Sequence, residues 1–214
     1  MMQRILDYLT PRTLGIIALA ALPPAALHFY YSLFNLNIPR MDAAQRSTRI
    51  AVKYIEGTLT PLDMIQAYFG HITVVRHTLT LLMTILTDWN VALEAYSNFW
   101  LATLSYLLIL ALVFHIDRQM VLPLMIPVSL LTYTVAQNQI WLAGYNAAWF
   151  DVEVLFLSAL FLLMVYPGRI WTLVLAGVVL FIATFSMGHG FMGWWLALPL
   201  ILLNHKGRAR VWVG

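Results

Sequence analysis

The stretch AYSNFWLATLSYLLILALVFHI, residues 95–116, decides the fold. It carries no Asp, Glu, Lys or Arg. A helix that crosses the hydrocarbon core of a bilayer needs about 20 predominantly apolar residues. This stretch therefore predicts one complete membrane-spanning helix.

The composition of the whole chain agrees with a membrane location. Of its 214 residues, 62% are apolar and only 10% are charged, whereas a soluble domain carries roughly a quarter charged residues. The lipid bilayer is therefore the main partner that we expect. The absence of cysteine excludes disulfides and thiolate metal sites. The mild excess of 12 Lys and Arg over 9 Asp and Glu does not indicate nucleic acid, and we interpret the basic residues as topology markers.

The charge-free stretches predict an all-α, polytopic transmembrane helix bundle with six to seven spans, forming one domain over residues 1–214. Pro23 and Pro24 lie inside the first span, where neighbouring helices must satisfy the carbonyls that proline leaves free, so we expect a kink. The predicted parts are a first span at 13–36, an outer loop at 37–77, a short or re-entrant helix at 78–94, the remaining spans at 95–203 and a basic cytoplasmic tail at 204–214.

The long first loop has its own helical pattern. Residues 42–56 predict an amphipathic helix that Gly57 ends. Thr60 is a candidate N-cap, with Pro61 at the first helical position and Asp63 near the positive helix end. Apolar residues follow at helical spacing from Met64 to Phe69. We therefore expect two amphipathic helices beside the membrane surface.

Basic residues set the predicted orientation. By the positive-inside rule they place both termini in the cytoplasm of a bacterial inner membrane. Segments 37–77, 137–148 and 186–190 then meet on the extracytoplasmic face, where the chain concentrates its polar side chains. The marker positions are Arg4, Arg12, 115–118, Arg169 and 206–210.

Several residues on that face are functional candidates. Asp42 is either a catalytic carboxylate or a helix N-cap, and taken alone the N-cap is the commoner role. His71, Arg76 and His77 either bind a phosphate or contact lipid headgroups, because Arg and protonated His donate to phosphate oxygens. Asp151 and Glu153, at the mouth of a span, are either functional or solvated.

A second set is rich in amides and aromatic rings. Amides pair with hydroxyls and aromatic rings stack on sugar faces, so these residues predict a sugar or acceptor pocket; the alternative is an aromatic belt at the membrane edge. They are Gln137, Gln139, Trp141, Tyr145 and Asn146. His189, between two glycines, is either a ligand in this pocket or a loop residue. No pair of histidines has metal-ligand spacing, so we predict no metal site built from them.

Three segments carry a family resemblance: Asp42 with EGTLTPLD (56–63) and GH (70–71) before LTDWN (86–90); QNQIWLAGYN (137–146); and ATFSMGHG (183–190). Their order and spacing resemble bacterial polytopic glycosyltransferases of the GT-C superfamily, the class that includes the protein mannosyltransferases. The resemblance departs at Gly70, Ile72 and Gln139, where relatives carry Glu, Arg and Glu.

The resemblance implies transfer of a sugar from a polyprenyl-phosphate donor on the extracytoplasmic face, with Asp42 as the acidic residue that acts on the acceptor. It leaves a divalent cation open as a cofactor. An N-terminal fragment, a shortened enzyme and a degenerate member all fit it. The alternative from another class is a non-enzymatic membrane subunit or scaffold of a larger complex.

Overall fold

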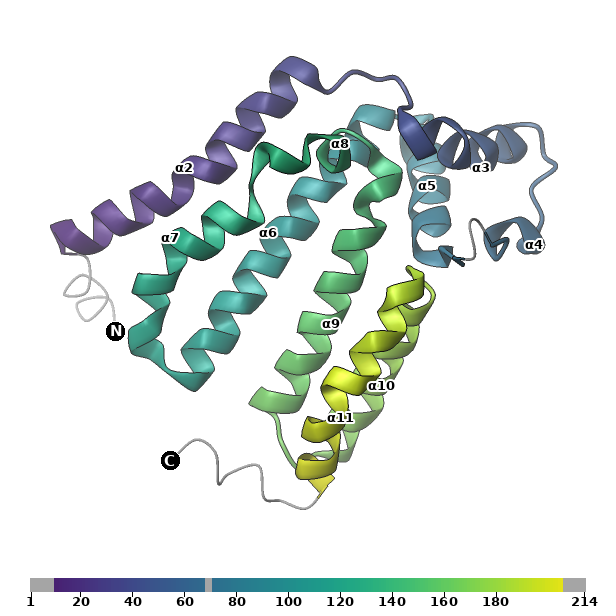
Figure 1. The fold of residues 1–214 in the computed structure, drawn as a ribbon. Helices are drawn as coiled ribbons and strands as arrows, with labels where there is room; N and C mark the ends of the chain where they lie inside the picture. Colours follow the sequence, from purple (N-terminus) through teal and green to yellow (C-terminus); the bar gives the residue numbers. More distant parts are fainter. Residues whose placement is uncertain (1–9, 68–70, 206–214) are drawn as a thin grey trace.

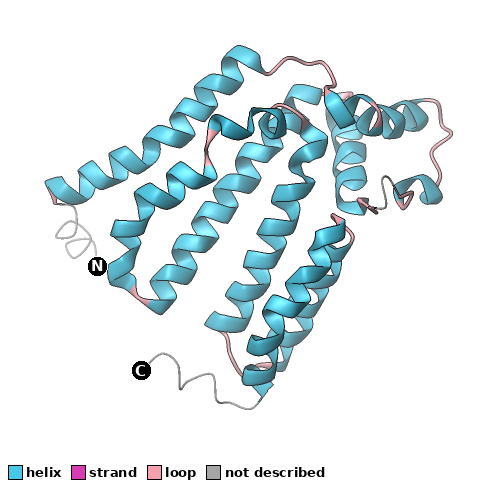
Figure 2. Cartoon of the chain, in the orientation of Figure 1, coloured by secondary structure: helices cyan, strands magenta, loops and turns pink. Residues whose placement is uncertain are grey.

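The computed structural model describes residues 10–67 and 71–205, and the described secondary structure is helical (Figure 2). Figure 1 shows the long helices side by side, in the spatial order α2, α7, α6, α9 and then the pair α10 and α11. Consecutive helices run in alternate directions. Their bounds are α2 Pro11–Phe34, α6 Val91–Ile116, α7 Val121–Thr132, α9 Ala148–Val165, α10 Ile170–Thr184 and α11 Met192–His205.

Three described helices are long and apolar enough to cross a membrane. They are Pro11–Phe34, Val91–Ile116 and the stretch Gly144–Val165. The apolar helices that contain α7, α10 and α11 have only 10–17 residues. The described fold is all-α, as predicted, and three of the six to seven expected spans have the length and apolar composition of a complete crossing.

The two prolines of α2 lie in an unbroken helix. Pro24 has no N–H, so the carbonyl of Ala20, four residues earlier, loses its helical donor. The Ser129 hydroxyl on α7 donates to that carbonyl at 2.6 Å, and both residues are buried. A neighbouring helix thus satisfies the freed backbone group, as expected for proline inside a membrane helix.

The long first loop lies at one end of the bundle (Figure 1). The predicted helix 42–56 is a 3₁₀ turn, Met41–Ala44 (η1), followed by α3, Arg46–Ile55. Gly57 ends it with a φ of +68°, a conformation that favours glycine. The second helix, α4, is the single turn Pro61–Met64; Tyr68 and Phe69 of its expected apolar run lie outside the described residues.

The stretch 78–94 forms parts of two helices. Helix α5 covers Val74–Thr87, and Asp88 and Trp89 then take positive φ angles of 51° and 58°. This left-handed turn reverses the chain into α6, which starts at Val91 and so extends the predicted span 95–116 towards its N-terminus. At the same end of the bundle, residues 135–147 form only short turns: η3 Val135–Gln137, α8 Asn138–Trp141 and η4 Gly144–Ala147.

Asp63 fastens α4 to α3. Its Oδ1 accepts hydrogen bonds from Lys53 at 2.5 Å and Arg49 at 3.0 Å, and its Oδ2 accepts from the Thr60 backbone N–H at 3.0 Å and hydroxyl at 2.8 Å. The hydrogen bond from Lys53, followed by those from Thr60, holds the pKa of the Asp63 carboxyl well below its usual range. The capping role predicted for Thr60 and Asp63 is present. In addition, Asp63 binds the side chains of Lys53 and Arg49.

We expect the stability that Asp63 provides to depend on pH. Because its folded-state pKa is lowered, this stability is fully present above the unfolded-state pKa of about 3.9 and is lost as the pH falls towards the folded-state value. Thermal unfolding midpoints should therefore be lower for Asp63→Asn than for wild type at pH 6, and the difference should shrink steadily as the pH falls below about 4. Glu56→Gln, an exposed change at the end of α3, is the control. A constant difference at all pH values would contradict this role.

Candidate active site

A pocket of about 260 Å³ lies where the three predicted outer segments meet. The first loop and the start of α5 supply Asp42, His71 and Thr73. The segment around η4 supplies Tyr145, Asn146, Ala148 and Trp149, and the turn between α10 and α11 supplies Met187. The predicted convergence of segments 37–77, 137–148 and 186–190 is thus present, and four predicted site residues line one cavity.

Asp42 and His71 each carry a side-chain polar atom without a hydrogen-bond partner among the described residues. No residue in the described part of the chain hydrogen-bonds to the Asp42 carboxylate, which is partly exposed and follows the left-handed residue Met41 (φ +51°). His71 Nδ1 is buried and also has no partner. The His71 ring lies so close to Gly188 that any side chain there would overlap it. The Asp42 carboxylate is therefore available to a ligand, whereas His71 Nδ1 faces the backbone of Gly188.

The lining of the pocket also includes hydroxyl and aromatic groups. The hydroxyls of Thr73 and Tyr145 share a hydrogen bond of 2.6 Å. The Trp149 side chain is 49% exposed, and its ring stacks on His189 with centroids 4.8 Å apart. Burial and the nearby His71 lower the pKa of His189, so its ring is neutral at pH 7. His189 thus contacts the pocket indirectly, through the ring of Trp149. Trp149 itself was not among the site residues predicted from the sequence.

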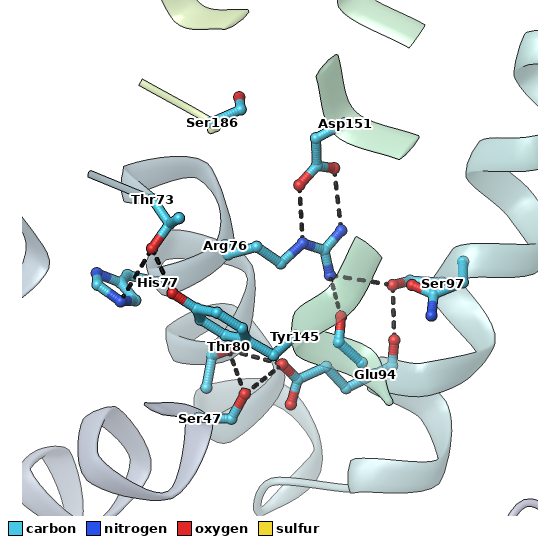
Figure 3. A network of polar contacts seen from close by, with 12 residues as sticks. Ser47, Thr73, Arg76, His77, Thr80, Glu94, Ser97, Tyr145, Asp151 and Ser186 are labelled. Carbon is cyan, nitrogen blue, oxygen red and sulfur yellow. Dashed lines mark hydrogen bonds and ion pairs between the residues drawn. The ribbon is translucent and has the colours of Figure 1, made fainter. Parts of the chain in front are cut away.

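Beneath the pocket, Arg76 forms a buried ion pair with Asp151 (Figure 3). Arg76 is 1% and Asp151 4% exposed. Two bonds of 2.7 and 2.9 Å join Arg76 Nε and Nη2 to the carboxylate, and Nη1 donates to the Gly144 carbonyl at 3.1 Å. Through these bonds Arg76 holds α5, η4 and α9 together. Arg76 and Asp151 also line a pocket of about 530 Å³, and the predicted contact of Arg76 with a donor phosphate stays an untested prediction.

A second buried centre is Glu94, which is fully buried near the start of α6. Its Oε1 accepts from Ser47 on α3 at 2.8 Å and from Thr80 on α5 at 2.7 Å (Figure 3). Its Oε2 accepts from the Trp89 indole N–H at 3.1 Å. Glu94 therefore anchors the outer loop to the bundle. A carboxylate in an otherwise apolar helix is a sequence signal for such a role. Glu94 was nevertheless not among the residues selected from the sequence.

His77 also belongs to this buried layer. Its Nδ1 donates to the Met64 carbonyl at 2.8 Å, which fixes α4 against the first turn of α5. Burial is the main cause that lowers the pKa of His77, and Arg46 and Arg49 act in the same direction. The ring is therefore neutral at pH 7, and its role as a cationic phosphate ligand stays an untested prediction.

The remaining predicted residues lie elsewhere. Trp141 is 0% exposed; its Nε1 donates to Thr134 O at 2.8 Å and its ring stacks on Phe150. We therefore assign Trp141 to the core, because an enclosed ring cannot line a pocket. Gln139 lines a second pocket, described below. The Gln137 side chain lies outside the described part.

Gly144 allows the close contact between η4 and α6. A Cβ at this position would lie 2.8 Å from Glu94 Cγ and 3.1 Å from the Ala95 backbone nitrogen. We expect Gly144→Ala to reduce the free energy of unfolding by about 1–3 kcal/mol, the usual effect of overpacking, as measured by denaturant titration in mixed micelles. Gly177→Ala in α10, where a Cβ meets nothing within 4 Å, is the control and should be neutral or stabilising. Equal values for the two variants would contradict this packing.

The described residues contain no group of three or more His, Asp and Glu side chains placed to hold a metal ion. Comparisons with known protein families, with curated proteins and with solved structures find no match. The site is a pocket lined by polar and aromatic side chains at one end of a bundle of apolar helices.

Proposed function

We propose that this chain is a GT-C-like membrane glycosyltransferase module that transfers a sugar from a polyprenyl-phosphate donor. The observation that carries the proposal is the pocket that gathers Asp42, His71, Tyr145 and Asn146 from three separate segments. A sugar needs hydrogen-bonding groups together with an aromatic surface, and Trp149 supplies the surface.

In the proposed reaction, an acceptor hydroxyl attacks the anomeric carbon of the sugar. The new bond joins the acceptor oxygen to that carbon, and the bond from the carbon to the phosphate oxygen breaks, so polyprenyl phosphate leaves. The Asp42 carboxylate accepts the hydroxyl proton. A carboxylate can act in this way when the proton moves late, as the donor bond breaks.

We also propose that α2, α6, α7, α9, α10 and α11 make six crossings of a bacterial inner membrane, with both termini in the cytoplasm. Their alternating directions support this count (Figure 1). The shorter α7, α10 and α11 are accommodated by local thinning of the bilayer, which costs fractions of a kcal/mol per ångström. The pocket then opens at the extracytoplasmic face, where the helices α3, α4 and α5 lie.

The test is transfer of a radiolabelled sugar from polyprenyl phosphate by the purified protein in proteoliposomes. We expect label in a non-extractable or newly glycosylated product, dependent on the donor lipid. Co-purification of stoichiometric protein partners, with no transfer and no binding of polyprenyl lipids, would instead support a non-enzymatic membrane subunit.

A further inference from the structure

A second pocket, of about 300 Å³, lies at the same end of the bundle. It is formed between the end of α2, the residues that lead into η1, and α8. The residues that line it are Tyr30, Arg40, Met41, Asn138, Gln139, Leu142 and Ala143. Its polar groups are a guanidinium, two amides and a phenol, and it contains no carboxylate. This is a set of donors suited to an anion.

Met41 lies between the two pockets. Arg40 lines the second pocket and Asp42 lines the first, while Met41 has a φ of +51°. A non-glycine residue in the left-handed region costs of order 1 kcal/mol and persists only where the surroundings impose it, most often at functional sites. Here the conformation gives neighbouring residues of opposite charge access to separate cavities.

Arg40 is a cation available to a ligand. In the described part of the chain no residue forms a hydrogen bond or ion pair with its guanidinium, and the side chain is partly exposed. Arg76, by contrast, is enclosed and paired with Asp151. An arginine fork binds phosphate oxygens in two parallel hydrogen bonds, and the amides of Asn138 and Gln139 add further donors.

The surroundings favour a phosphate that carries a lipid chain. The pocket adjoins the last turns of α2, where Phe29, Leu33 and Phe34 are exposed large apolar side chains. Leu142 and Ala143 add apolar lining. If Arg40 holds the phosphate of a lipid, the lipid chain can extend along the apolar surface of α2 into the hydrocarbon. A free phosphate ion has no chain to place on this surface.

We propose that this second pocket binds the phosphate of a phosphorylated lipid through Arg40, Asn138 and Gln139. The identification of that lipid as the polyprenyl-phosphate donor rests on the proposed function, whereas the anion site itself does not. The donor phosphate and the acceptor hydroxyl would then approach from opposite sides of Met41, with Asp42 on the acceptor side.

The experiment measures binding of a short-chain polyprenyl phosphate to the full chain in detergent, by native mass spectrometry and calorimetry. We expect Arg40→Gln to weaken binding about ten- to a hundredfold, the loss of charged hydrogen bonds, and to leave binding of the polyprenol without phosphate unchanged. Gln139→Leu should weaken binding as well. Arg118→Gln, an exposed arginine at the other end of α6, is the control and should bind as wild type does.

Equal affinity of wild type and Arg40→Gln, at equal melting temperatures, would overturn the site. So would a wild-type affinity for polyprenol equal to that for polyprenyl phosphate. Equally tight binding of phosphatidic acid, lost in Arg40→Gln, would keep the phosphate site and assign it to membrane phospholipid. Binding of polyprenyl phosphate that depends on Arg40, without any sugar transfer, would keep the site and remove the proposed function.

Discussion

Replacing Asp151 with Asn will reduce the free energy of unfolding by about 3–5 kcal/mol, because it leaves the buried Arg76 charge without its partner. Asp151 makes both charged contacts with the guanidinium, and the neutral amide can accept but no longer neutralise the charge. The loss should exceed that of Asp63→Asn, because the two cations that contact Asp63 are partly exposed and stay hydrated. Denaturant titration in mixed micelles measures the difference.

Two comparisons separate this ion pair from general effects of substitution. Asp117→Asn, an exposed cap of the turn after α6, should change stability by less than about 0.5 kcal/mol, since Asn and Asp cap equally well. The double variant Arg76→Met with Asp151→Leu should be more stable than Asp151→Asn, because replacing both charges leaves neither one unpaired. A loss below about 1 kcal/mol for Asp151→Asn would show that the pair does not hold α5 to α9.

Replacing Asp42 with Asn should reduce sugar transfer about 10²- to 10⁴-fold, the usual contribution of a general base. The amide keeps the size of the side chain and cannot accept the proton. Since no residue in the described part of the chain forms a hydrogen bond or ion pair with this carboxylate, we expect the melting temperature to stay the same. Initial rates in proteoliposomes with labelled donor provide the measurement.

Glu56→Gln is the matched control for this substitution, because Glu56 is an exposed carboxylate in the same outer loop and does not line the pocket. Its transfer rate should equal that of wild type. Equal activity of Asp42→Asn and wild type would remove Asp42 from the mechanism, and an equal loss in both variants would indicate an effect of loop charge.

The gathering of Asp42, His71 and Tyr145 could be predicted from the sequence because it depends on topology alone. Charge-free stretches define helices, consecutive helices alternate in direction, and the intervening polar segments are therefore sorted to two ends of the bundle. The capping of α4 by Thr60 and Asp63 could also be predicted from the sequence, since capping depends on the local spacing of residues. Both kinds of prediction need no knowledge of side-chain packing.

The partner of Arg76 could not be predicted in this way. Asp151 lies 75 residues further along the chain, and only the packing of α5 on α9 brings the two together. Trp141 and Trp149 show the same limit at short range, because one is enclosed in the core and the other is half exposed at the pocket. They lie on either side of short turns without periodicity, so the sequence contains no pattern that assigns them to different faces.

The polar residues 137–139 predict that the span beginning after Gln119 ends near them. In the structure α7 already ends at Thr132, and the chain continues through η3, α8 and η4. The amide of Asn98 on α6 donates to the Ile140 carbonyl at 2.7 Å and so satisfies a backbone group of these turns. Hydropathy indicates such a break but not the residue at which the helix ends.

Photo-crosslinking tests the central claim, that the Asp42 pocket holds the sugar of a lipid-linked donor, most directly. A polyprenyl-phosphate sugar with a diazirine on the sugar ring would be irradiated with the protein in proteoliposomes, and the modified peptides mapped by mass spectrometry. The account predicts crosslinks at residues 42, 71–73 and 145–149, suppressed by excess unmodified donor. Crosslinks confined to residues 118–120, at the opposite end of the bundle, or to the lipid-facing surface of α2 would contradict it.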